Sequence, residues 1–216
     1  MPATDASRDP HRIQWVVFDY GEVISRRSVA FPQLAAMMGA ELPAFREAYR
    51  RGRDAYVLGS SDADYWHAVG ARLGVSVDDD LIHALTRLDI QGWLVVDRAA
   101  VELIEDLHDA GIRLALLSNL PSSLARAVER QPWTRAFRHL LFSADIGVAK
   151  PNAGSWRTLV TRLNTNPDAC LMLDDRQYNV DAARAAGLHA ERWSGADAAR
   201  QVLSELGVFL GRGVQR

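Results

Sequence analysis

Short apolar runs recur along the chain, and polar residues or glycine bound each of them. The first is partly β-branched and has the sequence WVVF at its centre. An unbroken apolar run of this length is typical of a β-strand that is buried on both faces, as in a parallel sheet. The sequence therefore predicts strands at residues 13–18, 112–118, 138–143, 169–175 and, more weakly, 188–193.

Amphipathic helical patterns lie between these runs. Ala100, Leu103, Ile104 and Leu107 share one face of a predicted helix, at the spacing i, i+3, i+4, i+7, and Gly111 supplies a C-terminal stop. Similar patterns occupy residues 152–164, 177–187 and 196–207. Strands and helices that alternate in this way favour an α/β fold with a doubly wound, Rossmann-like parallel sheet.

The interval from Ser28 to Gly92 breaks this alternation, because it contains successive helical patterns and no convincing strand. We predict that residues 26–92 form a small helical cap domain inserted after the first strand. Residues 1–25 and 93–216 would then form the α/β core domain that carries the active site.

Composition and charge exclude several classes of protein. The 216 residues carry a net charge of -2 and contain no Lys/Arg-rich run, so nothing indicates binding to nucleic acid or to an anionic membrane. No glycine-rich turn follows the first strand, which disfavours a dinucleotide site. The polar start, residues 1–12, lacks the apolar stretch of a signal peptide, and no window approaches a membrane span. Cys170 is the single cysteine, so no internal disulfide is possible and a cytoplasmic protein is expected. No heptad pattern indicates an oligomeric state.

Polar residues follow the predicted strands at their carboxyl ends, which meet at one edge of a parallel sheet. They are Asp19, Gly21 and Glu22 after the first strand, Ser118 and Asn119 after the second, Asp145 and Lys150 after the third, and Asp174 and Asp175 after the fourth, with Asn179 and Asp181 one turn later. Neighbouring carboxylates repel one another, and a hard divalent cation such as Mg²⁺ relieves that repulsion. This edge is therefore expected to hold a magnesium site.

The remaining residues of this edge suit phosphate chemistry. Lys150 would neutralise residual charge and hold a phosphate oxygen, and Ser118 would offer its hydroxyl. Backbone N–H groups that follow Ser118 would cradle an anion at a strand-to-helix turn. Asp19 would then be the nucleophile of a phosphoryl transfer, a reaction that depends chiefly on positioning and charge neutralisation.

At these residues the chain resembles the haloacid dehalogenase-like hydrolases, in the branch with a small helical cap. The matching segments are VVFDYGEVI, LALLSN, AKP and LDDRQYNVDAARAAGL, in that order. The resemblance implies that Asp19 forms an aspartyl-phosphate and that the Gly21 carbonyl ligates Mg²⁺. It also implies that Ser118 and the Asn119 backbone bind the phosphoryl group. Lys150 would bridge Asp19 and the phosphate, while Asp175 would be a direct metal ligand supported by Asp174.

The first motif departs from the family pattern at Gly21. Most phosphatases that this chain resembles have a second aspartate there, which protonates the leaving group and later activates water. Glycine does neither, although similar FDxGxV sequences include phosphatases of sugar phosphates. Glu22 is the nearest replacement, but strand alternation would aim it away from Asp19 unless the loop turns.

Structural roles compete with functional ones at several positions. Asp19 on its own would be a turn or cap residue. Arg26 and Arg27 are expected on a solvated face, and Asn179 and Asp181 in structural roles. The aromatic residues Tyr20, Tyr56, Tyr65 and Trp66 are expected in the core.

The predicted function is a Mg²⁺-dependent phosphatase that hydrolyses a small phosphorylated metabolite, with sugar phosphates among the candidates. One alternative is a catalytically poor member of the same fold that binds a phosphorylated ligand, as the glycine at position 21 suggests. The other is a metal-independent dehalogenase of 2-haloacids, which the Asp174–Asp175 pair disfavours.

Overall fold

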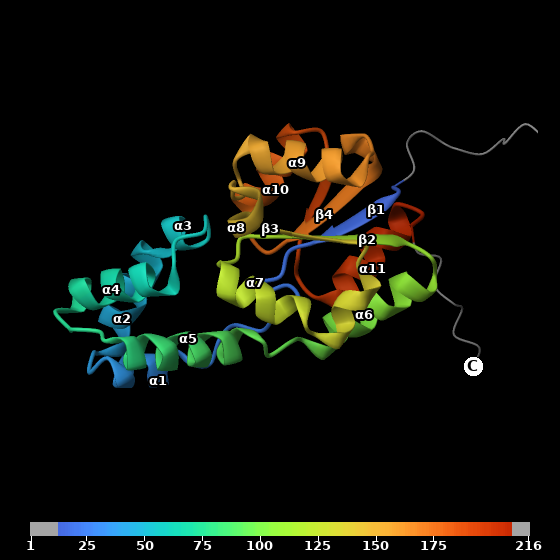
Figure 1. Ribbon diagram of the computed structural model, residues 1–216. Helices are drawn as coiled ribbons and strands as arrows, with labels where there is room; N and C mark the ends of the chain where they lie inside the picture. Colours follow the sequence, from blue (N-terminus) through green and yellow to red (C-terminus); the bar gives the residue numbers. More distant parts are fainter. Residues whose placement is uncertain (1–12, 209–216) are drawn as a thin grey trace, which may run out of the picture.

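The computed structural model describes residues 13–208, so the predicted polar start, residues 1–12, lies outside the described part. A five-stranded, wholly parallel sheet forms the centre of the molecule, in the order β3-β2-β1-β4-β5 (Figure 1). The strands are β1 (Trp15–Phe18), β2 (Arg113–Ser118), β3 (His139–Phe142), β4 (Cys170–Asp174) and β5 (His189–Arg192). The predicted strands and their parallel arrangement are confirmed.

The strand order places the end of β1 at the centre of the sheet. The chain moves outward from β1 to β2 and β3, and then crosses to the other side of β1 for β4. Phe18 pairs with Leu116 of β2 and with Leu173 of β4, so these three strands end close together. Ligands of doubly wound sheets bind where the strand order reverses, outside the carboxyl ends of the strands.

Two helical layers cover the sheet, because alternate residues of each buried strand face opposite sides. Val16 and Phe18 pack against one layer, and Trp15 and Val17 pack against the other. The first layer contains α6 (Arg98–Asp109), α7 (Ser122–Glu129), the 3₁₀ helix η1 (Pro132–Ala136) and α11 (Ala196–Glu205). The second contains α9 (Ala153–Leu163) and α10 (Gln177–Ala185), while α8 (Ser143–Ile146) follows β3 and η2 (Pro167–Ala169) precedes β4.

Local signals fix several helix ends. The Asp97 carboxylate caps α6 by accepting from the backbone N–H groups of Ala99 and Ala100, at 2.9 and 3.2 Å. Gly111 follows that helix with a φ of 77°, as the predicted stop requires.

The segment from α1 to α5 is helical throughout and has its own hydrophobic cluster, which includes Phe45, Trp66 and Leu85. Its helices are α1 (Phe31–Met37), α2 (Leu42–Arg51), α3 (Arg53–Tyr56), α4 (Asp62–Leu73) and α5 (Asp79–Trp93). The last helix ends one residue beyond the predicted domain boundary. The carboxyl ends of the strands point towards this segment (Figure 1).

Two neighbouring stretches of chain connect the α1–α5 segment to the sheet. Ser25 and Val96 form an antiparallel bridge, and the Arg26 N–H donates to the Val95 carbonyl at 2.7 Å. The segment also contacts the core directly, since the Ser123 hydroxyl of α7 donates to Asp62 of α4 at 2.8 Å.

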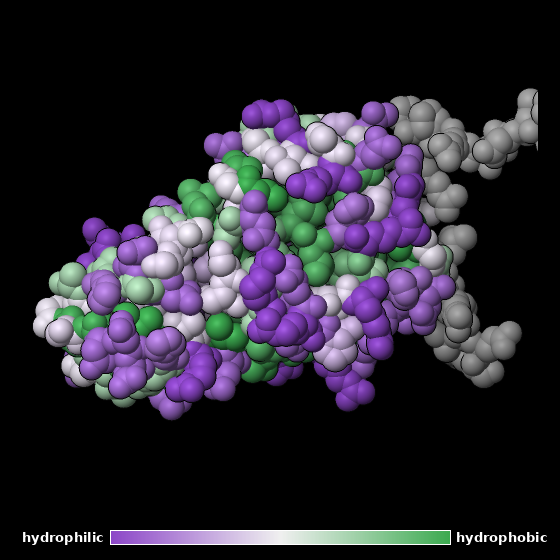
Figure 2. Space-filling model, in the orientation of Figure 1, coloured by the Kyte–Doolittle hydropathy of each residue, from purple (hydrophilic) through white to green (hydrophobic). Residues whose placement is uncertain are grey.

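Hydrophilic residues cover most of the helices on the face seen in Figure 2, and hydrophobic residues gather near its middle, where the edge of the sheet lies. None of the helices within residues 13–208 has both the length and the apolar character of a transmembrane span.

Candidate active site

A buried ion cluster lies at the carboxyl ends of β1 and β4. The Lys150 ammonium is 2.9 Å from the Asp19 carboxylate and 2.6 Å from the Asp174 carboxylate. All three side chains are at least nine-tenths buried. An isolated charge at this depth would be costly, so the lysine and the two aspartates stabilise one another.

Asp174 is fixed by more than the lysine. Its carboxylate accepts from the Arg176 N–H at 2.9 Å and from the side-chain amide of Asn179 at 2.9 and 3.1 Å. Asn179 comes from the first turn of α10, so it ties the loop after β4 to the helix that follows. The predicted structural role of Asn179 is confirmed.

Asn119 holds the loop that carries the lysine. Its amide donates to the Lys150 carbonyl at 2.8 Å, and its carbonyl oxygen accepts from the Lys150 N–H at 2.9 Å. This pair of hydrogen bonds joins the end of β2 to the loop after α8, although the two residues are far apart in the sequence. No pattern in the sequence predicts this contact.

Asp175 completes a group of three carboxylates. Ligand atoms of Asp19, Asp174 and Asp175 all lie within 4.8 Å of one another. Burial raises the pKa of Asp175 to about 6, and the charge of Asp19 contributes to the rise. Burial also raises the pKa of Asp19, against the charge of Lys150 and with the help of Asp174. Burial is the largest cause of both rises, and the charge of a neighbouring carboxylate adds to each.

Lys150 and Ser118 both favour the ionised form of Asp19. Burial alone would lower the pKa of Lys150, but Asp19 and Asp174 outweigh that effect and hold it above its usual value. Ser118 is 2% exposed, and its hydrogen bond to Asp19 lowers the pKa of that carboxyl. Lys150 thus stays charged beside a carboxylate that must be ionised to act as a nucleophile.

The chain turns sharply after Asp19. The Tyr20 carbonyl accepts from the N–H groups of Ile24 and Ser25, at 2.9 and 2.8 Å. Glu22 has a φ of 57°, in the left-handed region that only a few non-glycine residues occupy. Because of this turn, Glu22 lines the same cavity as Asp19, where simple strand alternation would have aimed it away.

Gly21 shows no conformational need for glycine. Its φ is not in the left-handed region, and a Cβ built on it meets no heavy atom within 4 Å. Since Gly21 lines the cavity with Asp19, the space beside the carboxylate is open.

A cavity of about 500 Å³ lies over this cluster, between the core and the α1–α5 segment. The core lines it with residues that include Asp19, Gly21, Glu22, Ser118, Lys150 and Asp175. The helical segment contributes residues that include Phe31, Arg46, Tyr49, Arg50, Arg53 and Trp93. All the predicted site residues except Asp174 line this cavity, and Asp174 lies directly behind Lys150.

The sequence reasoning missed the residues that the α1–α5 segment supplies. Arginines spaced along an amphipathic helix look like a solvated face, and only packing shows that Arg46, Arg50 and Arg53 border a cavity. Asp89 was missed as well. It is 3% exposed and accepts from the Tyr49 hydroxyl at 2.8 Å. The available signal in the sequence is an aspartate at helical spacing from Ile82 and Leu85, on a face that is otherwise apolar.

Asp89 predicts a pH dependence of stability. Burial raises its pKa to about 6, from an unfolded value of about 3.9. As the pH rises, the unfolded chain releases this proton first, so the contribution of Asp89 to stability falls through that window. Between about pH 4 and about pH 7, we expect the free energy of unfolding of Asp89→Asn to rise by on the order of 2 kcal/mol relative to that of the wild type.

Chemical denaturation across this pH range measures the effect. The control is Gln91→Asn, at an exposed position of the same helix, whose difference from the wild type should not change with pH because neither side chain titrates. A constant difference between Asp89→Asn and the wild type would contradict the assignment.

Other acidic and aromatic candidates lie away from the cluster. Asp145 pairs with Arg126 on the surface, and Asp181 is exposed and accepts from Gln177 at 2.8 Å. Arg26 is exposed and 3.7 Å from Asp97, as expected of a solvated residue. Arg27 is exposed too, but it also borders the cavity and lies 3.6 Å from Glu22. The aromatic residues expected in the core, Tyr20, Tyr56, Tyr65 and Trp66, are all buried.

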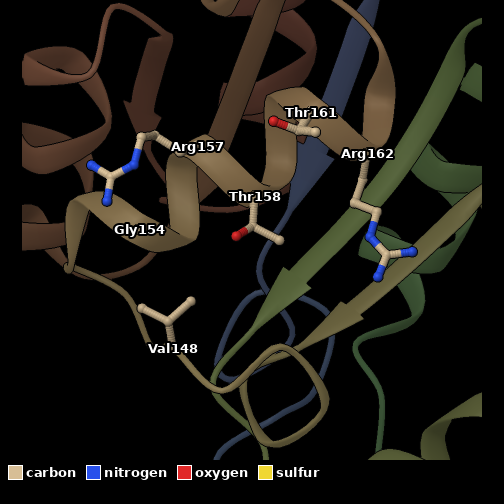
Figure 3. Close-up of a pocket in the computed structure, with 6 residues that line it drawn as sticks. All are labelled: Val148, Gly154, Arg157, Thr158, Thr161 and Arg162. Carbon is tan, nitrogen blue, oxygen red and sulfur yellow. The ribbon is translucent and has the colours of Figure 1, made fainter.

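A second hollow, of about 320 Å³, lies along α9 (Figure 3). Its lining residues are Val148, Gly154, Arg157, Thr158, Thr161 and Arg162. The two arginines point away from one another, and none of these residues is a carboxylate or belongs to the strand ends. The cavity over Asp19 therefore remains the candidate active site.

Two of the known proteins to which the chain is similar are named phosphatases. A phosphoglycolate phosphatase from Aliivibrio fischeri is 29% identical over 90 residues, which cover 41% of this chain and 40% of that protein. A sesquiterpene phosphatase, astK, from Aspergillus oryzae is 23% identical over 126 residues, which cover 58% of this chain and 63% of that protein. The chain thus spans less than two thirds of the length of either relative.

A solved structure shares the fold. The HAD family enzyme bt-2542 from Bacteroides thetaiotaomicron superposes with a TM-score of 0.73 at 14% identity, over 89% of this chain and 98% of that one. Its wild-type complex with magnesium and inorganic phosphate superposes with a TM-score of 0.68 at 15% identity, over 85% and 95% of the chains. The model of a family described as haloacid dehalogenase-like hydrolase matches residues 13–187. This match covers most of the sequence, and the chain therefore belongs to the haloacid dehalogenase-like hydrolases.

Proposed function

We propose that the protein is a Mg²⁺-dependent phosphatase that hydrolyses a small phosphorylated metabolite through an aspartyl-phosphate on Asp19. The observation that carries this proposal is the cluster at the end of β1. The buried Asp19 carboxylate is 2.9 Å from the Lys150 ammonium, and ligand atoms of Asp174 and Asp175 lie within 4.8 Å of it. An open cavity lies above this cluster. Phosphatase-named relatives support the same reaction class.

The donor set fits a hard divalent cation. Lys150 contacts two of the three clustered carboxylates, and burial together with the charge of neighbouring aspartates raises the pKa of both Asp19 and Asp175. The buried Asn179 Oδ1 also has no hydrogen-bond partner within the described residues, which leaves an acceptor for a water beside the cluster. Oxygen ligands with a remaining phosphate and waters suit Mg²⁺. The complex of the related fold with magnesium and phosphate agrees with this choice.

We assign Asp19, Asp175 and the Gly21 carbonyl to the metal, with Asp174 supporting it through its position between Lys150 and Asn179. When bound, the ion neutralises the carboxylates and the phosphoryl oxygens, so that an anionic nucleophile approaches an anionic ester. Every other role falls to the side chains and backbone of this chain.

In the first step, a carboxylate oxygen of Asp19 attacks phosphorus while the bond from phosphorus to the ester oxygen breaks. The departing alkoxide takes up a proton from solvent water and leaves as an alcohol. In the second step, water attacks the phosphoryl group and gives up a proton to solvent, while the bond from phosphorus to the Asp19 oxygen breaks, which restores the carboxylate and releases inorganic phosphate. Positioning and charge neutralisation supply most of the acceleration in such transfers.

Lys150, Ser118 and the Asn119 N–H are assigned to the transferring phosphoryl group. Lys150 bridges Asp19 and the phosphate, and its backbone is held by the two hydrogen bonds that it makes with the Asn119 side chain. The hydroxyl of Ser118 already contacts Asp19. We also propose that residues 26–92 act as a cap domain, because they line the cavity and connect to residues 1–25 and 93–216 through two stretches of chain that an antiparallel bridge joins.

Removal of the metal is the direct test. We expect release of inorganic phosphate from a panel of phosphomonoesters in Mg²⁺, and a loss of at least about a hundredfold in excess EDTA, because the carboxylates then repel the substrate. Activity should return when excess Mg²⁺ is added, while Ca²⁺ at the same concentration restores much less, because it binds with looser geometry.

Two other outcomes would overturn the proposal in different ways. Release of halide from 2-haloacids that survives EDTA would identify a dehalogenase. Thermal stabilisation by phosphorylated ligands without any turnover across the panel would identify a binding protein.

A further inference from the structure

The wall that the α1–α5 segment gives to the cavity is cationic. Arg46 and Arg50 come from α2, and Arg53 comes from α3. Among the lining residues described for this segment, Asp54 is the one carboxylate. Glu47 lies beside this wall and pairs with both Arg50 and Arg51. Arg46 and Arg53 have no carboxylate within ion-pair distance in residues 13–208.

Arg53 is held in a fixed position. Its guanidinium donates to the Tyr49 hydroxyl at 3.0 Å and lies 5.2 Å from the centre of that ring and 5.7 Å from that of Tyr56. The Tyr49 hydroxyl in turn donates to the buried Asp89 at 2.8 Å and accepts from the Trp93 indole at 3.1 Å. A guanidinium held in this way still has most of its five N–H donors available to bind another partner.

Arg53 and the ion cluster line the same cavity from different parts of the fold, Arg53 from α3 and the cluster from the strand ends. Lys150 is already paired with two carboxylates, and the aromatic residues Phe31, Tyr49 and Trp93 also line the cavity. Arg46 lies over the Phe31 ring, 5.7 Å from its centre, on the same wall. A volume of about 500 Å³ is in the range of sites for whole small molecules, more than a single phosphate fills.

We propose that Arg53, together with Arg46, binds a second anionic group of the substrate. The enzyme would then select phosphomonoesters that also carry a phosphate or a carboxylate over esters with a plain alkyl or hydroxylated end. A fixed guanidinium suits either anion, because its planar fork matches carboxylate and phosphate oxygens. This inference rests on the proposed function for the phosphoryl end of the substrate.

A matched substrate series tests the selection. It compares alkyl phosphates, ω-carboxyalkyl phosphates and alkanediol bisphosphates of equal carbon number, at several spacer lengths. We expect kcat/KM to be about ten- to a hundredfold higher for the best doubly anionic ester than for its alkyl counterpart. The carboxylate and bisphosphate arms show which anion is preferred.

Substitutions of single arginines show which residue causes the preference for doubly anionic esters. In Arg53→Met the ratio of kcat/KM between the doubly anionic ester and the alkyl ester should fall towards one, and Arg53→Lys should retain part of it. Arg51→Met is the matched control, because Arg51 is exposed, pairs with Glu47 and does not line the cavity. Its ratio should equal that of the wild type. A wild-type ratio near one, or an unchanged ratio in Arg53→Met, would refute the second anion site.

A binding experiment separates this inference from the catalytic one. Alkyl phosphonates and alkanediyl bisphosphonates carry no ester to hydrolyse, so their affinities are measured by calorimetry in Mg²⁺. Tighter binding of the bisphosphonate that depends on Arg53, with no ester hydrolysed, would uphold the anion site and disprove the phosphatase. Equal affinities of both ligands for the wild type would disprove the anion site whatever the enzyme hydrolyses.

Discussion

Asp19→Asn should abolish phosphatase activity, with a loss of more than about ten-thousandfold in kcat. The amide has nearly the same shape as the carboxylate but is not nucleophilic, so no aspartyl-phosphate can form. The buried site should tolerate the change, because the substitution removes a charge whose burial is unfavourable and leaves Lys150 paired with Asp174 at 2.6 Å. Phosphate release under saturating substrate measures the loss.

A second measurement on the same variant reports the chemistry of the carboxylate itself. Beryllium fluoride is a mimic of the phosphoryl group that attaches to a carboxylate oxygen. In Mg²⁺ it should raise the melting temperature of the wild type and leave that of Asp19→Asn unchanged. Asp181→Asn, at an exposed position that pairs with Gln177, is the control and should behave as the wild type in both assays. Full turnover by Asp19→Asn would remove the basis of the proposed mechanism.

Gly21→Asp should raise activity towards substrates with poor leaving groups by about a hundred- to ten-thousandfold, the usual contribution of a general acid–base group. The backbone at Gly21 has no left-handed φ, and an added Cβ has no heavy atom within 4 Å, so the side chain can be accommodated. The new carboxyl group would enter the cavity that Asp19 lines and would protonate the departing alkoxide.

The leaving group supplies the internal control for this prediction. Alkyl phosphates depart as strongly basic alkoxides and need the proton, whereas p-nitrophenyl phosphate departs as a weakly basic phenolate and should gain little. Gly21→Asn has almost the same size without the acid, and it should show no gain with either substrate. Equal gains in Gly21→Asn and Gly21→Asp would mean that the substitution acts through packing or position, and the acid–base interpretation would be wrong.

The strands and the charged cluster could be predicted because both depend on local signals. A short buried run identifies a parallel strand, and parallel strands bring their carboxyl ends to one edge, so Asp19, Lys150 and Asp174 were expected to lie together. Their contacts at 2.9 and 2.6 Å agree with that expectation. Pairing between the strands sets the register that makes these contacts possible. The connecting segments only have to be long enough to allow that pairing.

The cavity wall could not be predicted, since it depends on how one helical unit lies against another. The helical patterns predicted helices in this segment but not which part of their polar faces would meet the core. Arg53 illustrates the difficulty, because it is the first residue of the short helix α3 and is held by Tyr49 and Tyr56. The left-handed turn at Glu22 was equally hidden, as a glutamate carries no signal for a positive φ.

The bridge between Ser25 and Val96 gives the molecule a modular construction. Both ends of the inserted helices leave the sheet at the same place, and no strand pairing of the sheet runs through them. During evolution, such an insert can be lengthened, rebuilt or exchanged while the chemistry beneath it is preserved. Proteins that share the sheet and its ion cluster can thus differ in the substrates they recognise while the sheet keeps its fold.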